Sequence, residues 1–280
     1  MKKILVPCDF STNANAAFKT AVELAAASKG EVHVLHVIDI AVPTETAFGV
    51  QPYYISTEIL REFAASAEKK FQKMKARLKD TKVKVSLSIK SGPVSLTIGD
   101  YITNKKMTLV VMGTHGASGW KEFVVGSNTE KIVRSSPVPV IALRKAMTKR
   151  SIRHIVLPTT LELDQTAFMN QVKDLQEFFR AKIHVLFLNT PANFVRDADS
   201  IASLKDFARY YKLRNFTLNV RSEHQESDGI IHFAKEIKAN MIAMGTHGRK
   251  GLSHLMTGSI AEDVVNHLQL PIWTSQLRRE

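Results

Sequence analysis

The chain carries one glycine-spaced segment twice, and this repeat constrains the fold more than any other feature. The segment VVMGTHGASGWKEFVVGSNTEKIV, from Val110 to Val133, returns as MIAMGTHGRKGLSHLMTGSIAEDVV, from Met241 to Val265. In both copies an apolar run ends in Gly-Thr-His-Gly, and a Gly-Ser pair follows after nine further residues. Self-similarity of this kind indicates two copies of one folded unit.

The repeat extends from the glycine motif back to the start of each copy. Pro7 and Pro158 end the first apolar runs and are 158 − 7 = 151 positions apart, whereas Gly113 and Gly245 are 245 − 113 = 132 apart. The second copy is therefore about 19 residues shorter, and we assign the loss to segment 41–60. Segment 2–11 matches 153–162, and segment 31–39 matches 182–190.

Each copy reads as strands alternating with helices, with a glycine loop and a helix before the last strand. This order predicts a parallel sheet covered on both faces, and the continuous apolar runs agree with it. We expect an α/β chain of two tandem doubly wound, Rossmann-like domains, each with a parallel five-stranded sheet. The domains are residues 1–146 and 151–280, joined by a basic linker, 144–151. The third, fourth and fifth strands are expected at 82–89, 108–113 and 138–143, and again at 215–222, 240–245 and 270–276.

Composition excludes several classes of protein. The 280 residues are 44% hydrophobic, which allows a sizeable core, yet no uninterrupted apolar run is long enough to span a membrane. The first apolar run stops at Pro7 and Asp9, which is too short for a signal peptide. Cys8 is the only cysteine, so an internal disulfide and a cysteine metal cluster are excluded. We expect a soluble cytoplasmic protein without membrane contact.

The net charge of +13 is compatible with an anionic ligand or partner. Its densest run, Lys69 to Lys90, predicts an amphipathic helix up to Lys79, with Phe71 and Met74 facing inward. Leu78 belongs to the same inward face. Aromatic residues are not interleaved with the lysines on the outer face, as base stacking would require. We interpret the run as a solvated helix face and do not expect nucleic acid as a partner, although this alternative stays open.

The glycine loop stands where a doubly wound sheet binds ligands, beyond the carboxyl end of its fourth strand. Glycine permits positive φ angles and a close approach of a ligand to the backbone. The following helix begins near Ser127, where free N–H groups and the helix dipole favour a phosphate. Ser127 is a candidate N-cap or hydroxyl donor. No Gly-Lys-Ser/Thr follows, so the loop is not a Walker A motif.

These motifs, with ILVPCDFS at the start and LHVID at the end of the second strand, resemble the universal stress protein family. The family spacing falls on Gly113, Gly116, Gly126 and Ser127, and again on Gly245, Gly248, Gly258 and Ser259. The resemblance implies ATP binding, with Mg²⁺ as a possible companion of the phosphates. It places Pro7, Asp9 and Val37 around the base, and Gly113, Gly116, Gly126, Ser127 and Asn128 around the ribose and phosphates. It also implies an internal pseudo-dimer paired through 138–143 and 270–276; a further homodimer stays open.

The second copy departs from the pattern in its base-binding half. Thr160 stands where Asp9 stands, and Phe187 replaces His36. A threonine does not reproduce the hydrogen bonds of a carboxylate. We expect nucleotide chiefly in the first copy and less surely in the second, whose site residues are Leu188, Gly245, Gly248, Gly258, Ser259 and Ile260.

Other chemistry-bearing residues do not form a catalytic set in the sequence. Cys8 is interpreted as a small buried residue rather than a redox thiol, and His115 and His247 as supporting or surface residues. His154 and His184 look isolated, with no metal-ligand spacing. We therefore assign no catalytic or metal-binding residue. The leading function is an ATP-binding stress or signalling module; a slow ATPase or nucleotidyl-transfer enzyme and a binder of nucleic acid or acidic partners are the alternatives.

Overall fold

The computed structural model describes residues 1–39, 56–78, 81–114, 126–247 and 269–277. Two α/β units follow one another along the chain. The first unit contains β1 (Lys3–Pro7), α1 (Thr12–Ser28), β2 (Glu31–Ile38), α2 (Thr57–Ala76), β3 (Lys84–Ser91), α3 (Val94–Asn104), β4 (Leu109–Gly113), α4 (Ser127–Ser135) and β5 (Val140–Leu143). After a short 3-10 helix, η1 (Lys149–Ser151), come β6 (His154–Pro158), α5 (Thr166–Phe179), β7 (Lys182–Asn189), α6 (Asp197–Tyr210), β8 (Phe216–Ser222), α7 (Glu226–Glu236), β9 (Met241–His247) and β10 (Ile272–Leu277).

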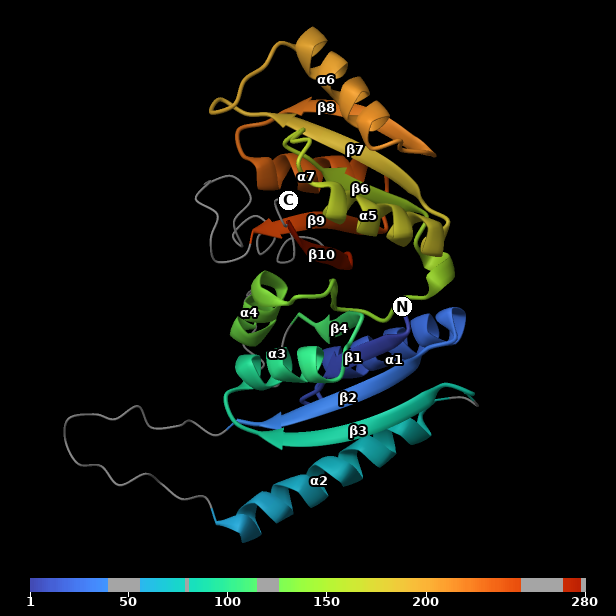
Figure 1. The fold of residues 1–280 in the computed structure, drawn as a ribbon, viewed down its shortest axis with the longest axis vertical. Coiled ribbons are helices and arrows are strands. Elements are labelled where there is room, and N and C mark those ends of the chain that lie inside the picture. Colours follow the sequence, from blue (N-terminus) through green and yellow to red (C-terminus); the bar gives the residue numbers. More distant parts are fainter. Residues whose placement is uncertain (40–55, 79–80, 115–125, 248–268, 278–280) are drawn as a thin grey trace, which may run out of the picture.

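The ten strands form one sheet in the order β3-β2-β1-β4-β5-β10-β9-β6-β7-β8. Neighbouring strands within each unit are parallel, as the alternating pattern predicts. The two units join through an antiparallel pair, with Trp273 of β10 opposite Ile141 of β5 (Figure 1). This pair covers an edge that each sheet would otherwise leave open. Both the doubly wound fold and the pairing through the fifth strands are confirmed.

Helices cover both faces of the sheet. The apolar sides of α1, α2, α5 and α6 pack with one face in a core that is continuous through both units. On the other face, α3 and α4 cover the first unit and α7 covers the second. The expected inward side of α2 is confirmed, because Phe71 and Met74 are buried and Leu78 packs against the same core. Among the described residues, no helix is long and apolar enough to cross a membrane.

The parallel arrangement gives each unit two chemically different ends. Helices begin near the carboxyl ends of the strands and finish near the amino ends, and in Figure 1 the arrows of β2, β3 and β9 all point to the left. Right-handed twist accumulates across the sheet, so outer strands of the two units point the same way in this view, although β5 and β10 at the junction are antiparallel. The amino ends of these outer strands therefore lie on one side of the molecule.

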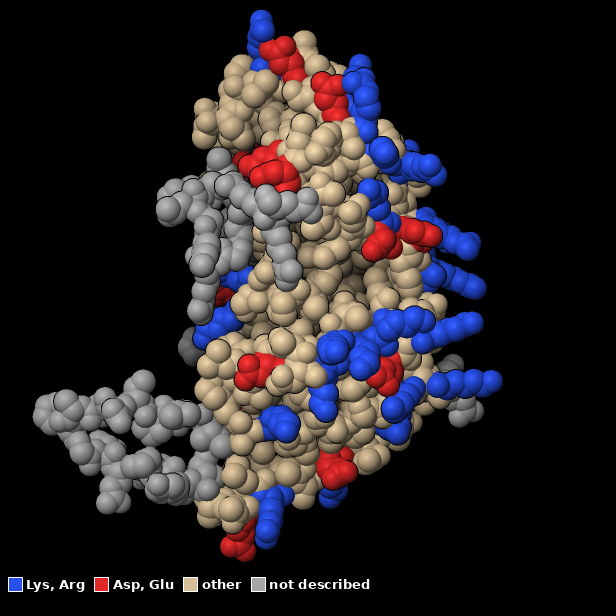
Figure 2. All heavy atoms as spheres, in the orientation of Figure 1, with Lys and Arg blue, Asp and Glu red and all other residues tan. Residues whose placement is uncertain are grey.

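This side carries basic residues at the junctions that connect a helix to the next strand. We call it the basic side, and Figure 2 shows its Lys and Arg side chains projecting at the right. In the first unit its residues are Lys29, Lys82, Lys84, Lys105 and Lys106. In the second unit they are Arg153, Arg180, Lys182, Lys212, Arg214 and Lys238.

Candidate functional site

The strand order of the first unit reverses between β1 and β4. From β1 the chain adds β2 and β3 on one side, whereas β4 and β5 lie on the other. The connections diverge at such a point, and the crevice outside the strand carboxyl ends is where doubly wound folds bind ligands. The equivalent point of the second unit lies between β6 and β9.

The end of β1 supplies one wall of the candidate site. Pro7 is the last residue of β1, and the N–H of Cys8 donates to the carbonyl oxygen of Leu35 at 2.9 Å. Asp9 is exposed, and its Oδ1 accepts a hydrogen bond from the N–H of Ser11 at 2.9 Å. Ser11 is the N-cap of α1. One carboxylate oxygen of Asp9 thus shapes the turn, and the other makes no hydrogen bond within the described part of the chain.

The second-strand histidine holds this turn in place. His36 Nδ1 lies 2.8 Å from the carbonyl oxygen of Cys8, so Nδ1 carries the proton and donates it. The His36 ring also lies 5.0 Å, between centroids, from the ring of Phe10, whose φ of 65° is left-handed. Val37 follows, half-buried near the end of β2. His36 therefore positions the turn before Asp9, and Val37 brings its backbone to the same end of the sheet.

Cys8 is a buried thiol at this turn. Its side chain is almost inaccessible, and burial raises the pKa of the thiol to about 12. The thiolate is the reactive form of cysteine, so a group held this far into its neutral form is a poor nucleophile at neutral pH. The structure supports the interpretation of Cys8 as a small buried residue.

The ends of the glycine loop are fastened to each other. The N–H of Gly126 donates to the carbonyl oxygen of Thr114 at 2.9 Å, and the Oγ1 of Thr129 donates to the carbonyl oxygen of Gly113 at 3.0 Å. Helix α4 therefore begins directly beside the end of β4. Sequence reasoning missed Thr129, and comparison of the copies gives no signal for it, because Ala261 stands at the matching position.

The first turn of α4 presents donors to solvent. Its N-cap is Gly126, so the expectation that Ser127 caps the helix is wrong; Ser127 is the first helical residue. Ser127 and Asn128 are both exposed. Their backbone N–H groups make no hydrogen bond among the described residues. Amides in this position, together with the positive end of the helix dipole, attract anions.

The first glycine of the motif has a packing role in both units; Gly113 ends β4, whereas Gly245 lies within β9, which continues to His247. A Cβ at Gly113 would lie 2.7 Å from the Cβ and 2.8 Å from the carbonyl carbon of Asn13, so glycine is needed for the close approach of α1. A Cβ at Gly245 would meet the side chain of Leu277 at 2.6 Å. These two positions are accounted for without a ligand. The other glycines of the motif, Gly116, Gly248 and Gly258, lie outside the described residues, as do Ser259, Ile260 and His115.

Comparison with known proteins agrees with this geometry. The family model described as "Universal stress protein family" matches residues 1–144 and again 151–275. The chain belongs to the universal stress protein family.

Several universal stress proteins are similar to it over one or both units. One from Synechocystis is 24% identical over 291 residues, covering 98% of this chain and 99% of that protein. One from Methanocaldococcus jannaschii is 29% identical over 148 residues, which is 51% of this chain and 82% of that protein. The crystal structure of a universal stress protein from Archaeoglobus fulgidus has a TM-score of 0.75 at 19% identity, with 99% and 98% coverage. This likeness shows that the tandem fold is shared.

The second universal stress protein unit builds the corresponding place differently. Thr160 is half-buried where Asp9 is exposed, and the ring of Phe187 is buried in the core where His36 makes its hydrogen bond. Leu188 is also buried, and a Cβ on Gly229 of α7 would lie 2.5 Å from its Cδ2. Neither the carboxylate nor the positioning imidazole of the first unit is present here.

The histidines at the amino ends of this unit are not isolated, contrary to the expectation from the sequence. His154 Nδ1 lies 3.0 Å from His184 Nε2, and His184 Nδ1 lies 2.8 Å from the Oγ1 of Thr217. Burial, followed by the nearby His154 and Lys182, lowers the pKa of His184 to about 4. Among the described residues, no group of three or more His, Cys, Asp or Glu side chains is arranged to hold a metal ion.

Proposed function

We propose that the first unit binds ATP in the crevice between β1 and β4 and that the protein acts as a nucleotide-responsive stress or signalling module. The observation that carries the proposal is the start of α4. The exposed N–H groups of Ser127 and Asn128 are fixed by Thr129 beside the end of β4, at the reversal of strand order. A phosphate chain fits such donors because the amides are already aligned before it binds.

In this proposal Asp9 and the backbone around Val37 receive the base and ribose. The carboxylate oxygen of Asp9 that has no hydrogen-bond partner among the described residues accepts hydrogen bonds from ligand N–H or O–H groups. Gly126, Ser127 and Asn128 face the phosphates, with Gly113, Gly116 and Pro7 completing the wall. Any Mg²⁺ is held mainly by the phosphates themselves, as is usual for this ion. The second unit lacks the carboxylate and is expected to bind ATP more weakly through Gly245, Gly248, Gly258 and Ser259.

Calorimetric titration of nucleotide-free protein with ATP and Mg²⁺ tests the base half of the site. Asp9→Asn keeps an Oδ1 acceptor for the N–H of Ser11 and replaces the second carboxylate oxygen with a donor. Loss of one hydrogen bond to a charged group costs roughly 1.5–3 kcal/mol, so Kd is expected to rise roughly 10- to 100-fold. Thr160→Ala at the matching position of the second unit is the control and is expected to leave this Kd unchanged.

The phosphate half is tested with Gly126→Val. Gly126 has φ −60°, which any residue adopts, so a new side chain would stand at the start of α4 without backbone strain. We expect ATP binding to be lost while the circular dichroism spectrum and melting temperature stay close to those of the parent. Unchanged ATP affinity in both Asp9→Asn and Gly126→Val would refute the assignment of the first unit. A Thr160→Ala effect as large as that of Asp9→Asn would move the site to the second unit.

A further inference from the structure

The basic side lies at the amino ends of the strands, away from the proposed ATP site at their carboxyl ends. Neighbouring strands are about 4.8 Å apart, so the nine steps across a ten-stranded sheet span about 43 Å. Lys or Arg precedes or begins most strands of both units along this length (Figure 2), whereas β5 and β10 at its middle follow Pro139 and Pro271. The cations thus form an extended row rather than a single cluster.

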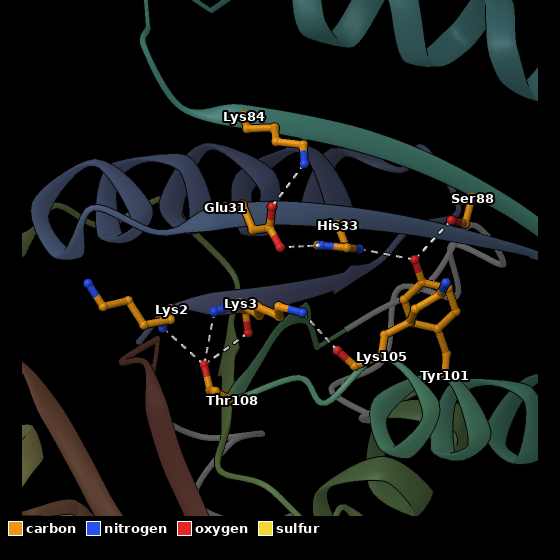
Figure 3. A network of polar contacts seen from close by, with 9 residues as sticks. All are labelled: Lys2, Lys3, Glu31, His33, Lys84, Ser88, Tyr101, Lys105 and Thr108. Atoms are coloured by element: carbon orange, nitrogen blue, oxygen red, sulfur yellow. Dashed lines mark hydrogen bonds and ion pairs between the residues drawn. The ribbon is translucent and has the colours of Figure 1, made fainter.

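Among the described residues of these junctions there is one carboxylate, Glu31, and it already pairs with a neighbouring lysine. Glu31 Oε2 lies 3.4 Å from Lys84 Nζ, and its Oε1 accepts a hydrogen bond from His33 Nε2 at 3.1 Å (Figure 3). The other ring nitrogen of His33 then accepts from the hydroxyl of Tyr101, 3.1 Å away. This network neutralises Lys84, and within the described residues the remaining cations of the row have no junction carboxylate beside them.

A hollow of about 580 Å³ opens at the lower end of the row, in the first unit. It is lined by Lys2, Lys3, Lys29, Lys82 and Lys84, with Glu31. Among the described residues, the ammonium groups of Lys29 and Lys82 have no carboxylate partner. Lysines this close repel one another, and an anion placed between them would relieve the repulsion.

Helix dipoles explain only part of this charge. Lys29, Lys105 and Arg180 are the C-caps of α1, α3 and α5, where a cation stabilises the negative end of the helix. That effect falls off within the last turn. Lys82 and Arg153 stand beyond it, next to the strands that follow, so helix stability does not account for them.

The residues around the row indicate what kind of partner fits. Among the described residues, the exposed large apolar side chains, such as Ile59, Leu96, Leu163 and Phe194, belong to segments near the carboxyl ends of the strands; Tyr210 is the exception there. A protein interface has an apolar centre, an inserted membrane surface needs apolar anchors, and a single strand needs aromatic platforms. A duplex backbone needs only cations spaced along its phosphates.

We propose that the basic side binds double-stranded nucleic acid through its phosphate backbone, without reading sequence. A row of about 43 Å is slightly longer than one turn of a duplex, roughly 34–36 Å. From the sequence, nucleic acid was only an open alternative, because aromatic residues are not interleaved with the lysines of the run Lys69 to Lys90. The other residues of the basic side are scattered along the chain, and the fold brings them into one row with Lys82 and Lys84. The proposal does not depend on ATP binding, which involves the opposite ends of the strands.

Fluorescence anisotropy with a labelled duplex of about 20 base pairs and mixed sequence tests the proposal between roughly 50 and 200 mM salt. The test variant is Lys82→Gln/Lys105→Gln/Arg153→Gln, whose side chains are exposed. Its matched control removes the same charge away from the basic side, as Arg61→Gln and Lys69→Gln on α2 with Lys90→Gln near the carboxyl end of β3, also at exposed positions. Circular dichroism and melting temperature verify that both variants fold.

Each phosphate contact contributes about 0.9 to the slope of log K against log salt, so three lost contacts should reduce the slope by up to about 3. We expect the test variant to bind the duplex at least tenfold more weakly at about 100 mM salt, and the control to bind like the parent. Absence of duplex binding by the parent at low salt, or an equal loss in the control, would overturn the proposal. Equal binding to phosphatidylserine vesicles, lost in the same variant, would assign the surface to membranes instead.

Discussion

Trp273 gives the sharpest test of how the two units hold together. Its side chain is 2% exposed, it lies opposite Ile141 across the β5–β10 pair, and its ring centroid is 5.8 Å from that of Phe168 on α5. A buried aromatic side chain removes about 150–250 Å² from water, worth roughly 4–6 kcal/mol at about 25 cal/mol per Å² as an upper estimate. Measured Trp→Ala costs in protein cores are about 3–5 kcal/mol. We expect Trp273→Ala to lower the free energy of unfolding by about 3–5 kcal/mol.

Guanidinium unfolding followed by circular dichroism at 222 nm measures this loss. Because Trp273 lies in a core continuous through both units, its loss should also separate their transitions, so that one unfolding step becomes two. Tyr210→Ala is the control, since that ring is 55% exposed, and it should change stability by less than about 0.5 kcal/mol. A loss below about 1 kcal/mol in Trp273→Ala, with a single transition retained, would refute the reasoning that the two units share one core.

Three further outcomes follow from local geometry. Gly113→Ala should lower the free energy of unfolding by about 1–3 kcal/mol, because the new Cβ forces α1 away at Asn13. Gly99→Ala in α3 should raise it by about 0.5–1 kcal/mol, because a Cβ there meets nothing within 4 Å. Thermal melts of both variants measure the contrast. Thr274→Val should leave the free energy of unfolding unchanged or raise it by up to about 1 kcal/mol, because Thr274 Oγ1 is buried without a hydrogen-bond partner among the described residues. Guanidinium unfolding measures this, and a lower stability of the variant would contradict it. The lowered pKa of His184 means that the unfolded chain binds the proton first, so stability should fall as pH falls from about 6.5 to about 4, and less steeply in His184→Gln.

The repeat made the fold predictable from the sequence. Apolar runs at matching positions predicted the order of the strands along the chain in both units. Pairing through the fifth strands was implied by the family resemblance, and the liability of an open sheet edge is compatible with it. The antiparallel pair of Ile141 and Trp273 agrees with that argument. Helix faces were equally readable, because the spacing of Phe71 and Met74 is set by the helical period alone.

The candidate site was less predictable, because its parts act through contacts that a motif does not encode. Gly113 fits a ligand loop in the sequence, yet the structure shows that the backbone of Asn13 requires it. Thr129 fastens α4 to β4 by a hydrogen bond between residues 16 positions apart, and no local pattern marks it. His154 and His184 looked isolated because they stand on different strands, which only the register brings together. Long-range contacts of this kind depend on the fold, so they become visible only once the fold is known.

The two proposed surfaces share one physical origin and should nevertheless act independently. In a parallel α/β unit every helix directs its positive end toward the carboxyl ends of the strands and its negative end toward the amino ends. Anionic phosphates are therefore favoured on one side, near Ser127, and Lys and Arg on the other. A strand such as β2, eight residues long, separates the sides by about 26 Å, about three Debye lengths at physiological salt. The charge of bound ATP is screened over that distance, so ATP should leave duplex affinity unchanged.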